Sequence, residues 1–317
     1  MENILLEHTD MLTVFGTAVL RGDDDEPVTT DHLLVSLASA TGTREIMDAA
    51  QLTRTVVSSV RQRRHAEWVS DDRGGPVGIV IAEGGTPADF SVAAAEALRR
   101  AARTAGPDGC DSRDVLLAIL DDSDCRAAAL LADCAAPVAA LRESLRDRRP
   151  LRIADPVPRE LHRVRDMMIG RTRYPRVPFW RNPLLMILAP ARVDLVPHPL
   201  AWLSLETREQ ARERGHRDAT TDDALLALLA MYETARLYPH LYAHAAAAYD
   251  GVTALAEAGA RYADLRALTT NLGADPRPLR KLIPAHPGDT RNLVRLLTGD
   301  TRAGRLLTAA GIEFTAS

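Results

Sequence analysis

The stretch Ala211–Leu229, ARERGHRDATTDDALLALL, decides the fold. Its segment TTD, residues 220–222, stands directly before a run of apolar residues, and side-chain oxygens in such a place satisfy the first backbone N–H groups of a helix. The same segment occurs near the other end of the chain, where residues 29–31 precede HLLVSL. Aligning Thr30 with Thr221 superposes TTDHLLVSL on TTDDALLAL without a gap, so the sequence contains an internal repeat.

Residues 1–148 contain two copies of a predicted four-helix unit. Residues 1–64 form the first copy. Residues 90–148 form the second, in which a serine takes the place of the threonine before the apolar run. A linker rich in glycine and aspartate, residues 65–89, separates the two copies, and its run VGIVIA favours a short extended segment. The two copies are therefore predicted to form one paired module.

Residues 198–317 contain two further copies, in which Gly259 and Gly311 stand at matching helix ends. The last copy is degraded, because prolines shorten or break its leading helix. A run rich in tyrosine and histidine, residues 230–249, is inserted in the third copy, and a Pro- and Arg-rich connector, residues 149–197, precedes it. The predicted fold class is all-α, with two tandem modules that each pair four-helix repeats about a pseudo-twofold axis.

The composition limits the classes of function. The chain has 317 residues, of which 46% are hydrophobic and only 4% aromatic, and this favours helices packed through small side chains. Its net charge of −4 offers no broad positive field for nucleic acid. Prolines and charges interrupt the most apolar long stretch, 183–205, so we expect no membrane span and a cytoplasmic protein. An odd set of cysteines favours reduced thiols, namely Cys110, Cys125 and Cys134.

The units resemble the Clp N-terminal repeat, the paired four-helix module at the start of ClpA, ClpB and ClpC unfoldases. One family pattern, A-R-x-x-G-H-x-x-x-x-T-E-H-[IL]-L-L-x-L, is matched by Ala211, Arg212, Gly215, His216, Thr221, Asp222, Leu225, Leu226 and Leu228, with Asp223 in the histidine place. A second, G-V-A-A-x-x-L-x-x-x-G, is matched in part by Gly251, Val252, Ala254, Leu255 and Gly259. In the first unit the matching residues are Thr30, Asp31, His32, Leu33, Leu34 and Leu37. The resemblance covers nearly the whole chain apart from the connector and the inserted run.

The resemblance implies binding rather than catalysis. Family members continue into AAA+ ATPase domains, whose phosphate-binding loop GxxxxGK[ST] needs a lysine. The only lysine here, Lys281, lies in LRKLIP without such a loop, so we expect no ATPase, no enzyme activity and no cofactor. Clp N-terminal domains dock substrates, adaptors and, in actinobacterial ClpC, cyclic peptide antibiotics. We therefore expect a non-enzymatic protein without an AAA+ motor that modulates Clp proteolysis or sequesters such peptides as a decoy.

The resemblance also implies where ligands bind, namely in grooves between the first helices of the paired repeats. The predicted groove of the first module is lined by Met1, Glu2, Val14, Phe90, Leu98 and Arg99. The predicted groove of the second module is lined by Leu200, Trp202, Leu203, Leu279 and Leu282. The alternative is that Phe90 and Leu98 are core residues and that Trp202 packs the connector onto the second module.

Two alternative functions fit the sequence less directly. One is a structural interaction protein that docks on the ClpC unfoldase through the connector and the run 230–249. The weaker one is a DNA-associated regulator, since paired short helices around a polar turn resemble a helix-turn-helix, although the acidic balance argues against it. His240 and His244 lie four residues apart in the inserted run without a third metal ligand in the pattern, so we expect an exposed pair on an inserted helix and no metal site.

Overall fold

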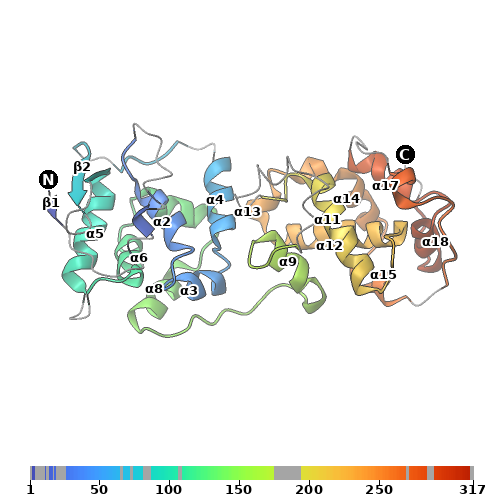
Figure 1. Ribbon diagram of the computed structural model, residues 1–317, viewed down its shortest axis with the longest axis horizontal. Coiled ribbons are helices and arrows are strands. Elements are labelled where there is room, and N and C mark those ends of the chain that lie inside the picture. Colours follow the sequence, from blue (N-terminus) through green and yellow to red (C-terminus); the bar gives the residue numbers. More distant parts are fainter. Residues whose placement is uncertain are drawn as a thin grey trace. The chain divides into compact units, whose positions relative to one another are not determined.

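The chain folds as two compact units, Met1–Ala154 and Asp155–Ser317, and the division falls inside the predicted connector. In the computed structural model, helices make up most of both units (Figure 1), in agreement with the predicted all-α class. The structure describes residues 2–3, 11, 14–16, 18, 26–64, 67–71, 74–80, 87–105, 109–174, 194–268, 271–283 and 289–314.

The first unit contains the predicted helices and a small sheet. Its helices are α2 (Thr30–Leu37), α3 (Arg44–Ala49), α4 (Arg54–Arg63), α5 (Val92–Thr104), α6 (Ser112–Leu120), α7 (Arg126–Asp133) and α8 (Val138–Arg146). Its strands are β1 (Glu2–Asn3), β2 (Val77–Val80) and β3 (Ala88–Phe90), in the order β1-β2-β3, with β1 parallel and β3 antiparallel to β2. The extended segment predicted for VGIVIA is thus confirmed over its first four residues. Most of the helix predicted near residues 4–21 lies outside the described residues, but residues 11, 14–16 and 18 are helical.

Side-chain caps determine where several of these helices begin. The Thr53 hydroxyl accepts a hydrogen bond from the N–H of Val56 at 3.3 Å, and the Ser91 hydroxyl accepts one from Ala94 at 3.2 Å. Asp111 caps α6, and it forms the reciprocal capping box with the third residue of the helix. Each cap satisfies backbone donors that have no partner inside the helix.

The second unit is built around one central helix. Helix α12 (Thr221–Arg236) is buried on nearly all sides, which explains why its sequence is apolar all round rather than on one face. It contacts α9 (His162–Met168), α11 (Pro199–Glu213), α13 (Pro239–Tyr242), α14 (Asp250–Glu257), α15 (Tyr262–Ala267), α17 (Thr290–Leu297) and α18 (Arg302–Ala309). The remaining helical segments are η1 (Arg159–Leu161), η3 (Ala246–Tyr249) and α16 (Leu279–Leu282).

Two features of the helices in the second unit were predicted and are confirmed. Gly259 and Gly311 follow helices α14 and α18 with φ of 101° and 72°, the left-handed conformation that favours glycine at a helix end. The leading helix of the last copy is reduced to the four residues of α16, as its prolines predict. The run 230–249 is not wholly an insertion, because α12 continues through its first residues to Arg236.

The cysteines lie inside the first unit. Cys110, Cys125 and Cys134 are buried free thiols. Burial raises the pKa of Cys110 and Cys134 to about 12, so these thiols stay protonated and unreactive at neutral pH. Within the described part of the chain, no helix combines the length and the apolar character needed to cross a bilayer.

Candidate functional site

The repeated threonine of the first unit lies in a buried junction of three segments. The N–H and hydroxyl of Thr30 both donate to Asp71 Oδ2 at 2.8 Å. The other carboxylate oxygen of Asp71 accepts the N–H of Arg126 at 2.9 Å, and the Thr30 hydroxyl accepts the N–H of Ala127 at 3.0 Å. Asp71 therefore ties the start of α2 to the start of α7 and satisfies donors at both helix ends.

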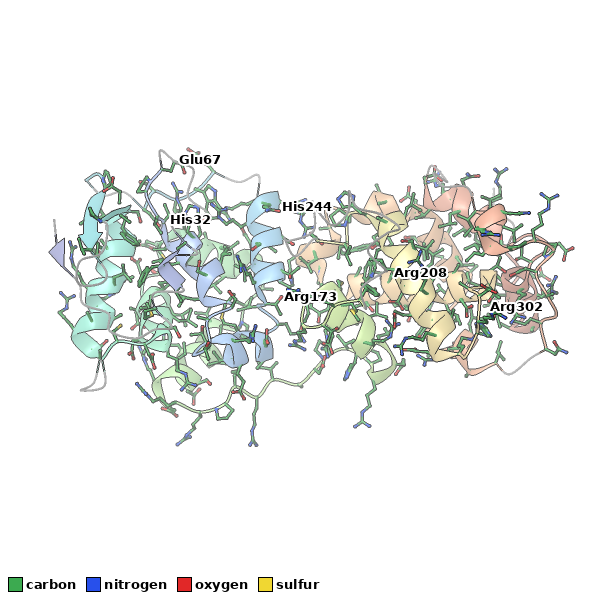
Figure 2. The ribbon with its side chains drawn as sticks, viewed as in Figure 1. His32, Glu67, Arg173, Arg208, His244 and Arg302 are labelled. Carbon is green, nitrogen blue, oxygen red and sulfur yellow. The ribbon has the colours of Figure 1, made fainter. Side chains whose placement is uncertain are left out.

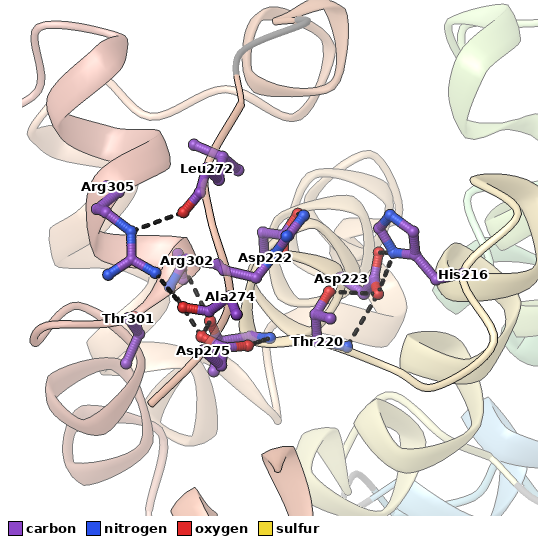
Figure 3. A network of polar contacts seen from close by, with 12 residues as sticks. His216, Thr220, Asp222, Asp223, Leu272, Ala274, Asp275, Thr301, Arg302 and Arg305 are labelled. Atoms are coloured by element: carbon purple, nitrogen blue, oxygen red, sulfur yellow. Dashed lines mark hydrogen bonds and ion pairs between the residues drawn. The ribbon is translucent and has the colours of Figure 1, made fainter. Parts of the chain in front are cut away.

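The second unit has a closely similar junction, in which Figure 3 labels Asp275 and Arg302. The N–H of Thr221 donates to Asp275 Oδ2 at 2.9 Å and its hydroxyl donates to Oδ1 at 2.7 Å, whereas both groups of Thr30 donate to one oxygen of Asp71. Asp275 Oδ1 accepts the N–H of Arg302 at 2.8 Å, and the Thr221 hydroxyl accepts the N–H of Ala303 at 3.0 Å. The two units thus share one way of joining an early helix to a late helix through a threonine and an aspartate from the intervening loop.

Two buried carboxylates of α12 are neutralised beside this junction. Asp222 accepts hydrogen bonds from Arg302 Nε and Arg214 Nη1, each at 2.7 Å, and Arg214 also reaches Asp223 at 2.8 Å. His216 Nδ1 lies 2.8 Å from Asp223 Oδ2. Burial by itself would raise the pKa of Asp222, but the hydrogen bonds from its neighbours, that from Arg302 above all, hold this pKa well below its usual range.

The first unit has a different charge pattern at the same place. Asp31 pairs with Arg61, and His32, which Figure 2 labels on α2, takes the position that Asp223 has in the second unit. Burial lowers the pKa of His32, and Arg61 lowers it further, so the imidazole is neutral at pH 7. Since these side chains are almost fully buried and bonded to one another, the motif that matches the family pattern is a structural element in both units.

The structure places three groove residues of the first module in the core. Val14, Phe90 and Leu98 are at most 1% exposed, and the ring of Phe90 packs edge-on against Phe15 with centroids 6.0 Å apart. The interpretation of Phe90 and Leu98 as core residues is confirmed, and these side chains have no surface open to a ligand. Arg99 is half-buried on α5. Met1 and the side chain of Glu2 lie outside the described residues, so the first groove stays a prediction.

The second predicted groove is divided between buried and accessible residues. Trp202 is fully buried, and its Nε1 donates to Tyr174 Oη at 2.6 Å, while Tyr174 Oη donates to Glu206 Oε2 at 2.8 Å. Tyr174 belongs to the predicted connector, so the alternative in which Trp202 packs the connector onto this unit is confirmed. Leu203 is buried as well. The partly accessible members are Leu200, Leu279 and Leu282.

A pocket that the sequence did not predict opens between α12, α13 and α14. Its volume is about 390 Å³, and its lining residues are Tyr232, Arg236, Tyr242, Thr253, Ala256, Glu257 and Arg261. Two tyrosine rings form its aromatic wall, with the centroids of Tyr232 and Tyr242 6.1 Å apart at an interplanar angle of 76°. A pocket with apolar walls and a few polar groups is the usual form of a ligand site, and we name it the tyrosine pocket.

Two signals in the sequence pointed to the tyrosine pocket. Three of its residues come from the tyrosine-rich part of the chain, and Thr253, Ala256 and Glu257 stand at the spacing of one helix face. These two signals did not suffice to predict the pocket, because the fold of the segment between α12 and α14 decides whether its residues come together. No periodicity in the sequence reports that fold.

The histidine pair does not form a metal site with its surroundings. Helix α13 ends at Tyr242, so His240 lies in the helix and His244 beyond it, and the prediction of an exposed pair on one inserted helix is wrong. His240 is half-buried and His244 is exposed. Across the described ranges of the chain, no three His, Cys, Asp or Glu side chains gather in a way that could hold a metal ion.

Comparisons with known proteins give no match. No protein-family model matches the chain, and neither a curated protein nor a solved structure is significantly similar to it.

Proposed function

We propose that this protein is a non-enzymatic peptide-binding protein of the Clp N-terminal repeat type, which acts on Clp proteolysis as a modulator or as a decoy for Clp-targeting cyclic peptides. The observation that carries the proposal is the junction of Thr30 with Asp71 and of Thr221 with Asp275. Both threonines belong to the motif that resembles the family. In both junctions the threonine donates to a loop aspartate and accepts the N–H of a residue at the start of a later helix. Two units built to one plan favour a binding module that is present in tandem.

Three leucines of the second unit are the accessible part of the predicted grooves. Leu200, Leu279 and Leu282 are partly exposed, and the last two lie on α16, a helix without buried residues. An apolar helix face that stays accessible is a usual contact for a peptide side chain. These leucines are therefore where we expect a cyclic peptide or an unfolded substrate to contact this unit.

Calorimetry tests the proposal directly. The full chain is titrated with a cyclic peptide that binds ClpC N-terminal domains and, separately, with an unfolded Clp substrate. We expect saturable binding of at least one of them, and a weaker affinity for the variant Leu282→Ser. The matched control is Ile153→Ser, because Ile153 is 44% exposed in the first unit and outside both predicted grooves. An absence of heat with both ligands would refute the proposal.

A second candidate function is docking on the ClpC unfoldase through the tyrosine-rich segment. The observation that favours it is the tyrosine pocket, since aromatic and arginine side chains are common anchors of protein interfaces. Deleting residues 230–249 would remove buried residues of α12 and unfold the unit, so the test uses Tyr242→Ala instead. Loss of unfoldase pull-down with retained cyclic-peptide binding would favour this candidate over the first.

A further inference from the structure

We propose that the tyrosine pocket binds the C-terminal residue of a peptide, with its apolar side chain against Tyr242 and its carboxylate on Arg236. The inference rests on the peptide-binding part of the proposed function and adds the chemical class that the pocket selects. The contacts of the pocket residues with one another support this inference.

The aromatic wall of the pocket is held rigid from behind. Tyr249 is fully buried, its ring centroid lies 5.7 Å from that of Tyr242 and 6.1 Å from that of Tyr232, and its hydroxyl donates to the carbonyl of Val196 at 3.1 Å. Tyr232 is nearly buried too, whereas Tyr242 is partly exposed at the pocket. Because the rings cannot turn away, an apolar side chain meets a fixed aromatic surface and binding costs little reordering of the protein.

Arg236 is the cation that is available to a ligand. It is exposed at the end of α12, and its guanidinium lies 5.4 Å from the centre of the Tyr232 ring. It also donates a long hydrogen bond of 3.4 Å to the Tyr232 hydroxyl, and no carboxylate in the described part of the chain pairs with it. The ring contact fixes the guanidinium over the pocket while most of its N–H groups remain able to bind a carboxylate.

The second arginine of the pocket is already engaged. Arg261 Nη1 donates to the backbone carbonyls of Ala256 and Ala260 at 2.5 and 2.8 Å. The carbonyl of Ala256 lies in the last turn of α14, where a cation compensates the helix dipole, and that of Ala260 lies in the turn after the helix. Arg261 thus serves the fold, and the proposal assigns the ligand carboxylate to Arg236 rather than to Arg261.

Glu257 completes a recognition set for a C-terminal residue. It is exposed at the pocket and forms no ion pair with any described residue, so its carboxylate is open to the N–H of a peptide bond. A C-terminal residue presents an apolar side chain, a carboxylate and an N–H from one Cα atom. An acidic side chain carries its charge at the end of flexible methylenes and would leave the ring of Tyr242 without an apolar partner. The combination of ring, cation and acceptor therefore favours a chain terminus.

Fluorescence anisotropy with four labelled octapeptides of one polar sequence tests the inference. Two peptides end in Phe, one with a free carboxylate and one with an amide. The third ends in Ala with a free carboxylate. The fourth has an internal Phe-Glu pair and an amidated C-terminus. We expect the Phe acid to bind the full chain about tenfold more tightly than each of the other three. The variant Arg236→Gln should reduce its affinity to that of the Phe amide, whereas Arg217→Gln, a change of an exposed arginine in the loop before α12, should leave it unchanged.

Each contrary outcome has a definite meaning. Equal affinity for the Phe acid and the Phe amide in the unchanged protein would overturn the inference without any variant, and so would equal affinity for the peptide with the internal Phe-Glu pair. If the peptides bind without discrimination while a Clp-targeting cyclic peptide binds as well, the proposed function stands and the inference fails. If neither the octapeptides nor the Clp ligands bind, both fail.

Discussion

The carboxylate of Asp275 holds Thr221 by two hydrogen bonds, one from its N–H at 2.9 Å and one from its hydroxyl at 2.7 Å. The same carboxylate accepts the N–H of Arg302 at 2.8 Å, so a single loop residue orders two helix starts that are far apart in the chain. Backbone donors at a helix start have no partner within the helix. Removing the aspartate therefore leaves several of them unsatisfied at once.

Asp275→Ala should lower the free energy of unfolding by about 2–4 kcal/mol, because each buried donor left without a partner costs about 1–3 kcal/mol. Urea unfolding monitored by circular dichroism measures the loss. Asp218→Ala is the matched control, since Asp218 is exposed in the loop before α12 and its removal should change stability by less than about 0.5 kcal/mol. Equal stability of the two variants would mean that the junction does not stabilise the unit.

The paired carboxylate Asp222 predicts a loss of stability in acid. Its pKa is lowered in the folded state from an ordinary value of 3.8, because the contributions of Arg302, Thr220 and Arg214 outweigh the effect of burial, which acts in the opposite direction. A lowered carboxyl pKa stabilises the folded state fully above the unfolded-state pKa, and this stabilisation is lost as the pH falls below about 4 through the folded-state value.

Asp222→Asn separates this effect from general acid unfolding. At pH 7 the variant should be less stable by about 3–5 kcal/mol, since Arg302 then faces an uncharged buried partner and Arg214 keeps Asp223 alone. The difference from the unchanged protein should shrink as the pH falls from 5 to 2. Urea unfolding at a series of pH values gives both curves, and a constant difference would contradict the assignment.

Gly251 is predicted to be irreplaceable for steric reasons. A Cβ atom there would lie 2.4 Å from the carbonyl oxygen of Thr290, where the start of α14 packs against the start of α17. Gly251→Ala should destabilise the unit by about 1–3 kcal/mol, the usual range for overpacking. At Gly299 a Cβ atom would have its nearest neighbour at 3.9 Å, so Gly299→Ala should be tolerated. Thermal unfolding of the two variants provides the comparison.

Tyr174 is predicted to anchor the connector to α11. Tyr174→Phe removes the acceptor of the Trp202 indole N–H and a donor to Glu206, and it should cost about 1–3 kcal/mol of unfolding free energy. Arg173→Ala is the control, because Arg173 is the exposed neighbour in the same segment. A Tyr174→Phe variant as stable as the control would show that the Trp202 contact contributes no net stability.

The sequence alone determined where most helices begin and end. Capping residues such as Ser91 and Asp111 and the glycines after α14 and α18 act on neighbouring backbone groups, so their effect can be worked out from a few adjacent residues. The internal repeat could be found in the sequence for the same reason. In each unit the threonine stands directly before the apolar run, so the two form one local pattern.

Only the tertiary structure decided which of those elements contact one another and which side chains are buried. Asp71 and Asp275 lie 41 and 54 residues from the threonines that they hold, in loops whose sequences carry no period. Apolar character cannot distinguish a groove from a core, because both require the same side chains. Phe90 and Trp202 could therefore be assigned to the core only from the positions of their neighbours in the fold. The tyrosine pocket exists because the chain after α12 turns back on that helix, and this path is set by long-range packing rather than by local preference.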